Sequence, residues 1–194
     1  MSGAFMLPTT LSKIINVVLY QVGWFSCVLG AALGYPVSGA VGALSLLAIH
    51  LLLADERKAE IQLMLCACLL GVVVDSLQQA SGVFTFKNDS GWPFWLPLWI
   101  PVIWAQFATL FRYALFWLSG RYLLAAFFGS VGGPLAYWGG VRLGAAQFGE
   151  NMLISLITLA LVWALVTPLL FWISSRLGHR EGRYRSFAAQ QGKP

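Results

Sequence analysis

Residues 61–79 read IQLMLCACLLGVVVDSLQQ, an almost wholly apolar segment that contains one carboxylate, Asp75. A helix that crosses a bilayer needs about 20 mostly apolar residues, and this segment has that length. An ionised Asp at the centre of such a helix costs about 2.5–3.5 kcal/mol on insertion scales, and ionisable residues at membrane depth commonly have a functional role. The segment therefore predicts a membrane-spanning helix, and it makes Asp75 the first candidate for a functional side chain.

The composition of the whole chain agrees with a membrane protein. Of its 194 residues, 59% are hydrophobic and 10% are charged, and the mean hydropathy is +0.76. Soluble domains carry about 25% charged residues, so this chain has too few to cover a water-exposed surface. The formal charge is +5, but five of the twelve basic residues lie beyond position 175 and no nucleic-acid-binding motif accompanies them. This pattern is typical of a basic flank beside a membrane span and excludes a nucleic-acid partner.

Six segments are long and apolar enough to cross a bilayer, and the connections between them are short. We therefore predict an all-α membrane protein, with a compact bundle of six transmembrane helices that forms one domain over residues 1–175. A basic cytoplasmic tail is predicted over residues 176–194. The connection 82–93 is polar and rich in turn-forming residues, which favours a loop. The predicted spans cover residues 13–34, 36–54, 59–81, 94–118, 121–144 and 151–175.

The basic residues set the expected orientation. Those at positions 13, 57, 58 and 121 and those of the tail fall on one side of the predicted spans. Only Lys87 and Arg142 fall on the other side. Because cytoplasmic connections carry the excess of Lys and Arg, both termini are expected in the cytoplasm, with the protein in a bacterial inner membrane.

Small residues repeat every four positions along the predicted span 121–144. Helices in a bilayer associate by close packing of small side chains, so two ridges of this kind predict helix contact faces. An alternative is that the Gly-Gly-Pro sequence at 132–134 breaks the helix and exposes its backbone to a ligand, as in transporters. The predicted packing residues are Gly129, Gly132, Gly133, Ala136, Gly140 and Gly144.

Polar residues at membrane depth form a first candidate group. At about 1.5 Å of rise per residue, Asp75 and Tyr137 lie at similar depths, with Arg142 a little further out. Gln78 and Gln79 follow Asp75 by three and four positions and share its helix face. We predict a cluster of Asp75, Tyr137 and Arg142 with the two glutamines at its mouth. The alternative is that Asp75 is a hydrogen-bonded anchor between helices.

A second group of polar residues lies closer to the predicted cytoplasmic side. His50 and Arg112 are near the inner ends of their spans, and Gln21 and Gln106 are near mid-depth. A packing role at headgroup level is the simplest interpretation of His50, and Arg112 is expected to extend towards the inner headgroups. The four residues are also candidates for lining the pocket.

The sequence contains no established catalytic or cofactor motif. HExxH, a Gly-rich phosphate loop followed by Lys, and GxSxG are all missing. Cys27, Cys66 and Cys68 lie in apolar segments without metal-ligand spacing, so neither a metal site nor a disulfide framework is expected. We predict no cofactor, and the sequence does not decide whether the protein is an enzyme.

Several strings resemble one family of bacterial membrane proteins, domain-of-unknown-function family 2878. These strings are QVGWFSCVLGAA (21–32), GVVVDS (71–76), WIPVIWAQFATL (99–110) and GSVGGPLAYWGGVRLGA (129–145), together with the single His50. The similarity covers roughly residues 12–175. The chain departs from the pattern at Arg112 and Tyr113, where members often carry Asn and His. The resemblance picks out Gln21, Trp24, His50, Asp75, Gly132, Gly133, Pro134 and Tyr137.

The resemblance implies no assigned activity, but it favours work on membrane lipids. Members are similar to proteins encoded near fatty-acid-modifying enzymes of the cyclopropane-synthase type. We therefore expect an intramembrane polar pocket, lined by Asp75, Gln21 and Tyr137, that binds or helps to process a membrane lipid or another amphipathic molecule. The alternatives are a small proton-coupled transporter that uses Asp75, and a structural partner that holds a lipid-modifying enzyme at the membrane.

Overall fold

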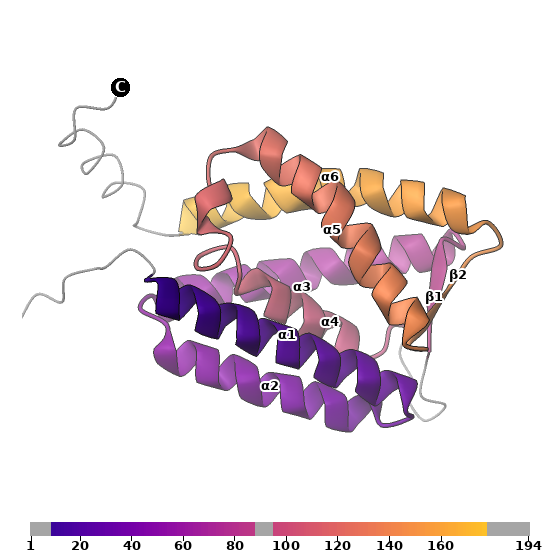
Figure 1. Ribbon diagram of the computed structural model, residues 1–194, viewed down its shortest axis with the longest axis horizontal. Coiled ribbons are helices and arrows are strands. Elements are labelled where there is room, and N and C mark those ends of the chain that lie inside the picture. The colour runs from indigo at the N-terminus through magenta and orange to yellow at the C-terminus, as the bar shows by residue number, and fades with distance from the viewer. Residues whose placement is uncertain (1–8, 88–94, 178–194) are drawn as a thin grey trace, which may run out of the picture.

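The computed structural model describes residues 9–87 and 95–177, and this part of the chain is almost entirely helical (Figure 1). It confirms the all-helical class, with one small two-stranded ribbon in addition. The elements in chain order are α1 (Thr10–Ala32), α2 (Pro36–Leu53), α3 (Arg57–Ala80), β1 (Phe84–Phe86), α4 (Trp99–Ala108), the 3-10 helix η1 (Phe116–Leu118), α5 (Tyr122–Arg142), β2 (Ala146–Phe148) and α6 (Met152–Leu177).

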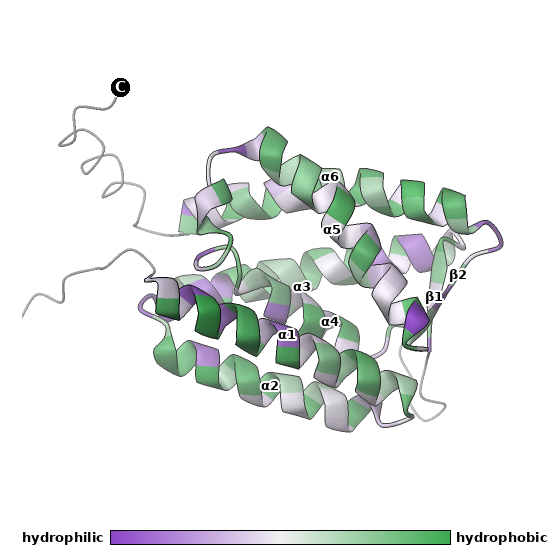
Figure 2. Ribbon diagram, in the orientation of Figure 1, coloured by the Kyte–Doolittle hydropathy of each residue, from purple (hydrophilic) through white to green (hydrophobic). Residues whose placement is uncertain are grey.

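Four of the described helices, α1, α2, α3 and α6, are long and apolar enough to cross a membrane. α5 has 21 residues, five of them glycines, and is not among these four. α4 has only ten residues. Figure 2 shows hydrophobic residues along the helices and hydrophilic residues mainly at their ends and in the connections. Large apolar side chains such as Leu123 and Leu165 point outwards, at 90% and 73% exposed, which suits a surface surrounded by lipid.

The helices pack in pairs. α1 lies against α2, α5 lies against α6, and α3 and α4 lie between the two pairs (Figure 1). The α1/α2 contact depends on glycines, because a Cβ added at Gly39 would lie 2.3 Å from the carbonyl oxygen of Ser26. Such close backbone approach is the usual basis of helix association in lipid.

The predicted span 94–118 is not one helix. α4 ends at Ala108, and the chain then runs through successive turns to η1. The backbone N–H groups of Thr109, Leu110 and Phe111 donate to carbonyls three residues earlier, at 3.2, 3.1 and 3.3 Å. This is the hydrogen-bond pattern of a 3-10 helix, which rarely extends beyond one turn.

Asn16 of α1 explains where the helix stops. Its side chain is 2% exposed, and its Nδ2 donates to the carbonyl oxygen of Thr109 at 3.1 Å. Its Oδ1 accepts a hydrogen bond from the backbone N–H of Ala114 at 3.3 Å. One amide side chain thus satisfies two backbone groups of the turn segment, and irregular backbone at membrane depth persists only where protein buries it.

β1 and β2 form an antiparallel ribbon that joins the connection after α3 to the connection after α5. The predicted loop 82–93 therefore contains a short strand, and its residues 88–93 lie outside the described part. The ribbon is fixed to α6, because the Ser155 hydroxyl donates to the carbonyl oxygen of Val83 at 2.6 Å. A Cβ at Gly149 would lie 1.9 Å from the carbonyl oxygen of Gly82, so only glycine fits at the end of β2.

Pro134 does not break α5. The helix runs without interruption from Tyr122 to Arg142, so the alternative of a helix break at 132–134 is wrong. Gly144 lies beyond the end of α5 in a left-handed turn with φ +87°, where an added Cβ would lie 4.0 Å from Cβ of Ala32. The predicted basic tail lies outside the described residues from position 178 onwards.

Candidate functional site

A cavity of about 280 Å³ lies between α1, α4, α5 and α6. α1 and α5 belong to different helix pairs and make little contact with each other, which leaves the space between them. The walls are mainly aromatic side chains and glycine backbone, and α3 contributes Asp75. The aromatic residues around the cavity include Tyr20, Trp24, Trp99, Trp104, Phe107 and Trp163.

One side of α5 packs against α6, and two of the predicted packing residues lie on that side. A Cβ at Gly133 would lie 2.1 Å from Cγ of Trp163. A Cβ at Gly129 would lie 2.3 Å from Oγ1 of Thr167. Side chains at these two positions would collide with α6, so both glycines are packing residues.

The other small residues of α5 form a wall of the cavity. Gly132, Ala136 and Gly140 all line it. A Cβ at Gly132 or at Gly140 would have no atom within 4 Å, so the prediction that these two glycines are helix contacts is wrong. Gly132 and Phe128 are exposed, so the cavity opens to the outside of the bundle at this level of α5.

Asp75 is the charged residue of the cavity wall. It is 1% exposed, and its Oδ2 accepts a hydrogen bond from Nε1 of Trp104 at 2.8 Å. Its Oδ1 accepts a hydrogen bond from the hydroxyl of Tyr137. Asp75 and Tyr137 therefore meet, as their depths predicted. Both carboxylate oxygens act as acceptors, which is the bonding pattern of the ionised form.

Trp104 is the partner of Asp75 that sequence reasoning missed. Gly71, one turn before Asp75, gives it room, because a Cβ at Gly71 would lie 2.2 Å from Cγ of Trp104. The indole of Trp104 also stacks on Trp163, with ring centroids 5.0 Å apart and planes inclined by 15°. The usable signal was Gly71, which leaves space on the face of α3 that carries Asp75.

Three polar groups of the cavity wall have no hydrogen-bond partner within residues 9–87 and 95–177. They are Nε1 of Trp99, Nε1 of Trp163 and Oγ1 of Thr167, and these residues are 3%, 8% and 3% exposed. The indole N–H of Trp163 lies near the Tyr137 hydroxyl but outside hydrogen-bonding geometry. Buried polar groups are normally paired, so unpaired groups in the wall of a cavity are unusual.

The structure does not bring Arg142 or Gln21 to Asp75. The guanidinium of Arg142 lies over the ring of Trp138, 5.6 Å from its centroid, on the exposed side of α5. Gln21 is exposed on α1 and is not part of the cavity wall. Both were expected near the carboxylate from their positions along the spans. Depth alone does not determine which way a side chain points, so this expectation was wrong.

The two glutamines that follow Asp75 have different surroundings. Gln79 donates to the carbonyl oxygen of Trp95 at 3.2 Å and accepts from the backbone N–H of Phe86 at 3.1 Å. It therefore holds the connection after α3 rather than the mouth of the cavity. Gln78 is 4% exposed, and neither of its amide atoms has a partner among the described residues.

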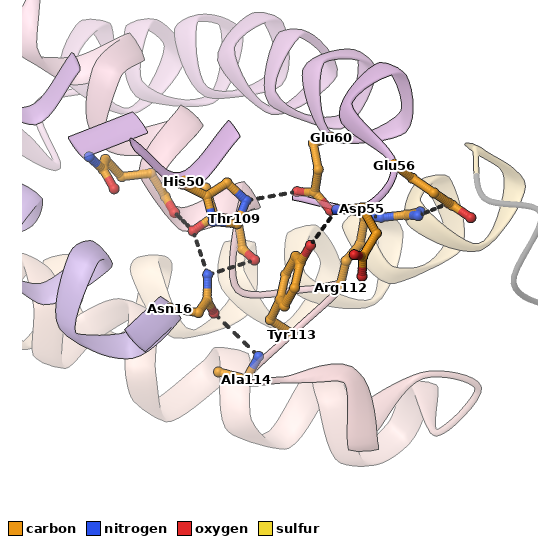
Figure 3. Close-up of polar contacts among 10 residues, drawn as sticks. Asn16, His50, Asp55, Glu56, Glu60, Thr109, Arg112, Tyr113 and Ala114 are labelled. Atoms are coloured by element: carbon orange, nitrogen blue, oxygen red, sulfur yellow. Dashed lines mark hydrogen bonds and ion pairs between the residues drawn. The ribbon is translucent and has the colours of Figure 1, made fainter. Parts of the chain in front are cut away.

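A second buried polar group lies at the other end of α3 (Figure 3). Arg112 is 3% exposed, with its Nε 2.8 Å from Oε1 of Glu60, and it also pairs with Glu56. Oε2 of Glu60 lies 3.2 Å from Nε2 of His50. We call these four residues the ionic cluster. Arg112 does not extend to the headgroups as expected, because the turns after α4 direct it into the bundle.

Side chains close to the ionic cluster in the sequence link α4 and the turns after it to α2. The ring of Tyr113 packs edge-on against His50, with centroids 5.2 Å apart. The hydroxyl of Thr109 donates to the carbonyl oxygen of Gln106 at 2.8 Å. Gln106 in turn donates from Nε2 to the carbonyl oxygen of Ala43 on α2 at 2.7 Å. Gln106 is thus an anchor between α4 and α2, and it does not line the cavity.

Sequence reasoning also missed both acidic members of the ionic cluster. Glu56 belongs to the DERK sequence at 55–58, which reads as a solvated connection. Glu60 follows in the first turn of α3 and is 1% exposed. Among the described residues, no group of three His, Cys, Asp or Glu side chains is arranged to hold a metal ion.

The fold and the cavity define a class: an all-helical protein whose long apolar helices suit a membrane and enclose an aromatic pocket with one carboxylate. The chain belongs to the family described as "Protein of unknown function (DUF2878)", whose model matches residues 13–169. No curated protein and no solved structure matches it. The match agrees with the resemblance drawn from the sequence strings.

Proposed function

We propose that this protein binds an amphipathic lipid in the cavity between α1, α4, α5 and α6. The observation that carries the proposal is the cavity itself: apolar walls, an opening beside Gly132, and a polar point at Asp75 and Tyr137. Ligand sites are typically apolar pockets with a few well-placed polar groups, and this cavity has that composition. An opening on the side of the bundle gives a lipid chain a direct route from the bilayer.

The proposal includes the location of the protein: a multi-pass protein of a bacterial inner membrane with six crossings. In this location a membrane lipid can reach the cavity directly. α1, α2, α3, α5 and α6 each provide one crossing in this arrangement. α4, the turns after it and η1 together provide the sixth, as a broken span buried among the others. The distribution of Lys and Arg supports cytoplasmic termini, and the exposed apolar surface supports lipid contact. A lipid-modifying enzyme as a partner stays a prediction from the resemblance.

Lipid analysis of the purified protein tests the binding proposal. Gly132→Leu places a side chain in open space inside the cavity, so it should displace lipid without a collision. Mass spectrometry of co-purified lipids should find a species enriched on the wild type and depleted on Gly132→Leu. The matched control is Val131→Leu on the exposed face of α5, which should retain the lipid. Equal lipid content in all three proteins would contradict the proposal.

Reporter fusions test the six crossings. Fusions after Lys58, Ser119 and Pro194 should report the cytoplasm, and a fusion near Phe148 should report the periplasm. A periplasmic C-terminus, or a cytoplasmic signal near Phe148, would contradict the arrangement.

A further inference from the structure

We infer that the cavity selects an uncharged lipid whose chain carries a neutral oxygen acceptor, such as an alcohol or an ester, over fatty acids and phosphate-bearing lipids. This inference rests on the proposed function and names the chemical class of its ligand. It depends on which charges and which unpaired groups face the cavity.

The charges of the site disfavour an anion. Among the described residues, no Lys, Arg or His lines the cavity, and Asp75 is its charged member. Arg112 is paired with Glu56 and Glu60 in the ionic cluster, and Arg142 lies on the exposed ring of Trp138. A buried charge is costly unless an opposite charge compensates it, so a carboxylate or phosphate has no partner here and faces repulsion from Asp75.

The unpaired donors favour a ligand that carries an oxygen atom as hydrogen-bond acceptor. The indole N–H of Trp99 can only donate a hydrogen bond, and the hydroxyl of Thr167 can donate as well as accept. Both are buried in the cavity wall without a partner in the described part of the chain. A hydroxyl, ester or keto oxygen satisfies such donors without bringing a charge into the cavity.

The two donors lie at opposite ends of the cavity. Trp99 packs edge-on against Phe86 of β1, with ring centroids 5.3 Å apart, at the ribbon end. Thr167 lies against Gly129, nearer to η1. Along α5, the residues that line the cavity extend from Gly140 to Gly129, about 16 Å at the helical rise. A hydrocarbon chain lies along this side of α5, with an oxygen at one end or the other.

Four probes with the same chain test the selectivity. They are 9,10-dibromostearyl alcohol, the methyl ester and the free acid of 9,10-dibromostearate, and 9,10-dibromostearyl phosphate, whose bromines quench nearby indoles. Trp104 and Trp163 line the cavity, so binding is read as quenching of tryptophan fluorescence in nanodiscs at equal probe mole fraction and pH 8. The alcohol and the ester should bind with a Kd at least about tenfold lower than that of the acid or the phosphate. Equal binding of the acid or the phosphate would overturn the inference.

Two variants test the donors. Thr167→Val keeps the shape but removes the hydroxyl, and Trp99→Phe removes the N–H; at least one should weaken alcohol binding by about three- to tenfold. Ser130→Ala, at a half-buried position, and Trp95→Phe, at an exposed one, lie outside the cavity wall; they are the controls and should leave alcohol binding unchanged. Unchanged alcohol binding in both test variants would overturn the role of the donors.

The failures of the two proposals are distinguishable. If Gly132→Leu does not reduce the quenching by any probe, the cavity is not the binding site and the proposed function fails. If Gly132→Leu abolishes quenching by all four probes but the acid binds the wild type as well as the alcohol does, only the selectivity fails.

Discussion

The two buried polar groups of the molecule contain similar residue types and differ in what surrounds them. In the ionic cluster, Arg112 is held by Glu56 and Glu60, and Glu60 also meets His50. At the cavity, Asp75 accepts hydrogen bonds from two neutral donors, while other polar groups of the same wall stay unpaired. A buried charge in a membrane segment is thus not a sign of function by itself. The open space and the unused donors beside Asp75 distinguish a candidate site from an anchor.

The largest effect is expected from the ionic cluster. Arg112→Met removes the cation and leaves Glu60 buried beside His50, and breaking a buried ion pair in this way costs about 3–5 kcal/mol of folding free energy. Arg142→Met, at an exposed position, should cost much less. Thermal unfolding in detergent would measure both. Addition of Glu60→Gln to Arg112→Met should recover part of the loss, and equal stability of Arg112→Met and Arg142→Met would contradict the anchor role.

A smaller loss of stability is expected on the side of α5 that packs against α6, and almost none on the side that lines the cavity. Gly133→Leu forces a side chain into Trp163, and overpacking of this kind costs about 1–3 kcal/mol. Gly132→Leu enters open space and should leave the unfolding temperature in detergent close to that of the wild type. If Gly132→Leu destabilises as much as Gly133→Leu, the space beside Gly132 is filled and the cavity does not exist there.

The role of Asp75 is tested by Asp75→Asn. Hydrogen bonds to a charged acceptor contribute about 1.5–3 kcal/mol and neutral ones about 0.5–1.5 kcal/mol, so the variant should stay folded with a loss of about 1–2 kcal/mol. It should also bind dibrominated fatty acid more tightly than the wild type, because the repelling charge is gone. Unchanged discrimination between the acid and the alcohol would show that Asp75 is an anchor only.

Most of the helices, and the contact between Asp75 and Tyr137, were predictable from the sequence. The features that were not predictable depend on contacts between residues far apart in the chain. Length and apolarity place five of the six helices within a few residues, and helical rise places Asp75 level with Tyr137. The break after α4 was not predictable locally, since it depends on Asn16, 93 residues away from Thr109. The ionic cluster follows from that break, because only the turns after Ala108 direct Arg112 towards Glu60.

The smallest difference in stability is expected between variants of Gln106 and Gln21, the two glutamines that the sequence placed near mid-depth. Gln106 is 1% exposed, donates to the carbonyl oxygen of Ala43 and packs so closely on α1 that a Cβ at Gly23 would lie 2.4 Å from its Nε2. Gln106→Leu loses this hydrogen bond and puts a branched side chain against Gly23, so we expect a loss of about 1 kcal/mol. Gln21 faces outwards, and Gln21→Leu should change stability by no more than about 0.5 kcal/mol. Unfolding of both variants in the same detergent would measure the difference, and a larger loss for Gln21→Leu would mean that the outward face of α1 at this depth contacts protein rather than lipid.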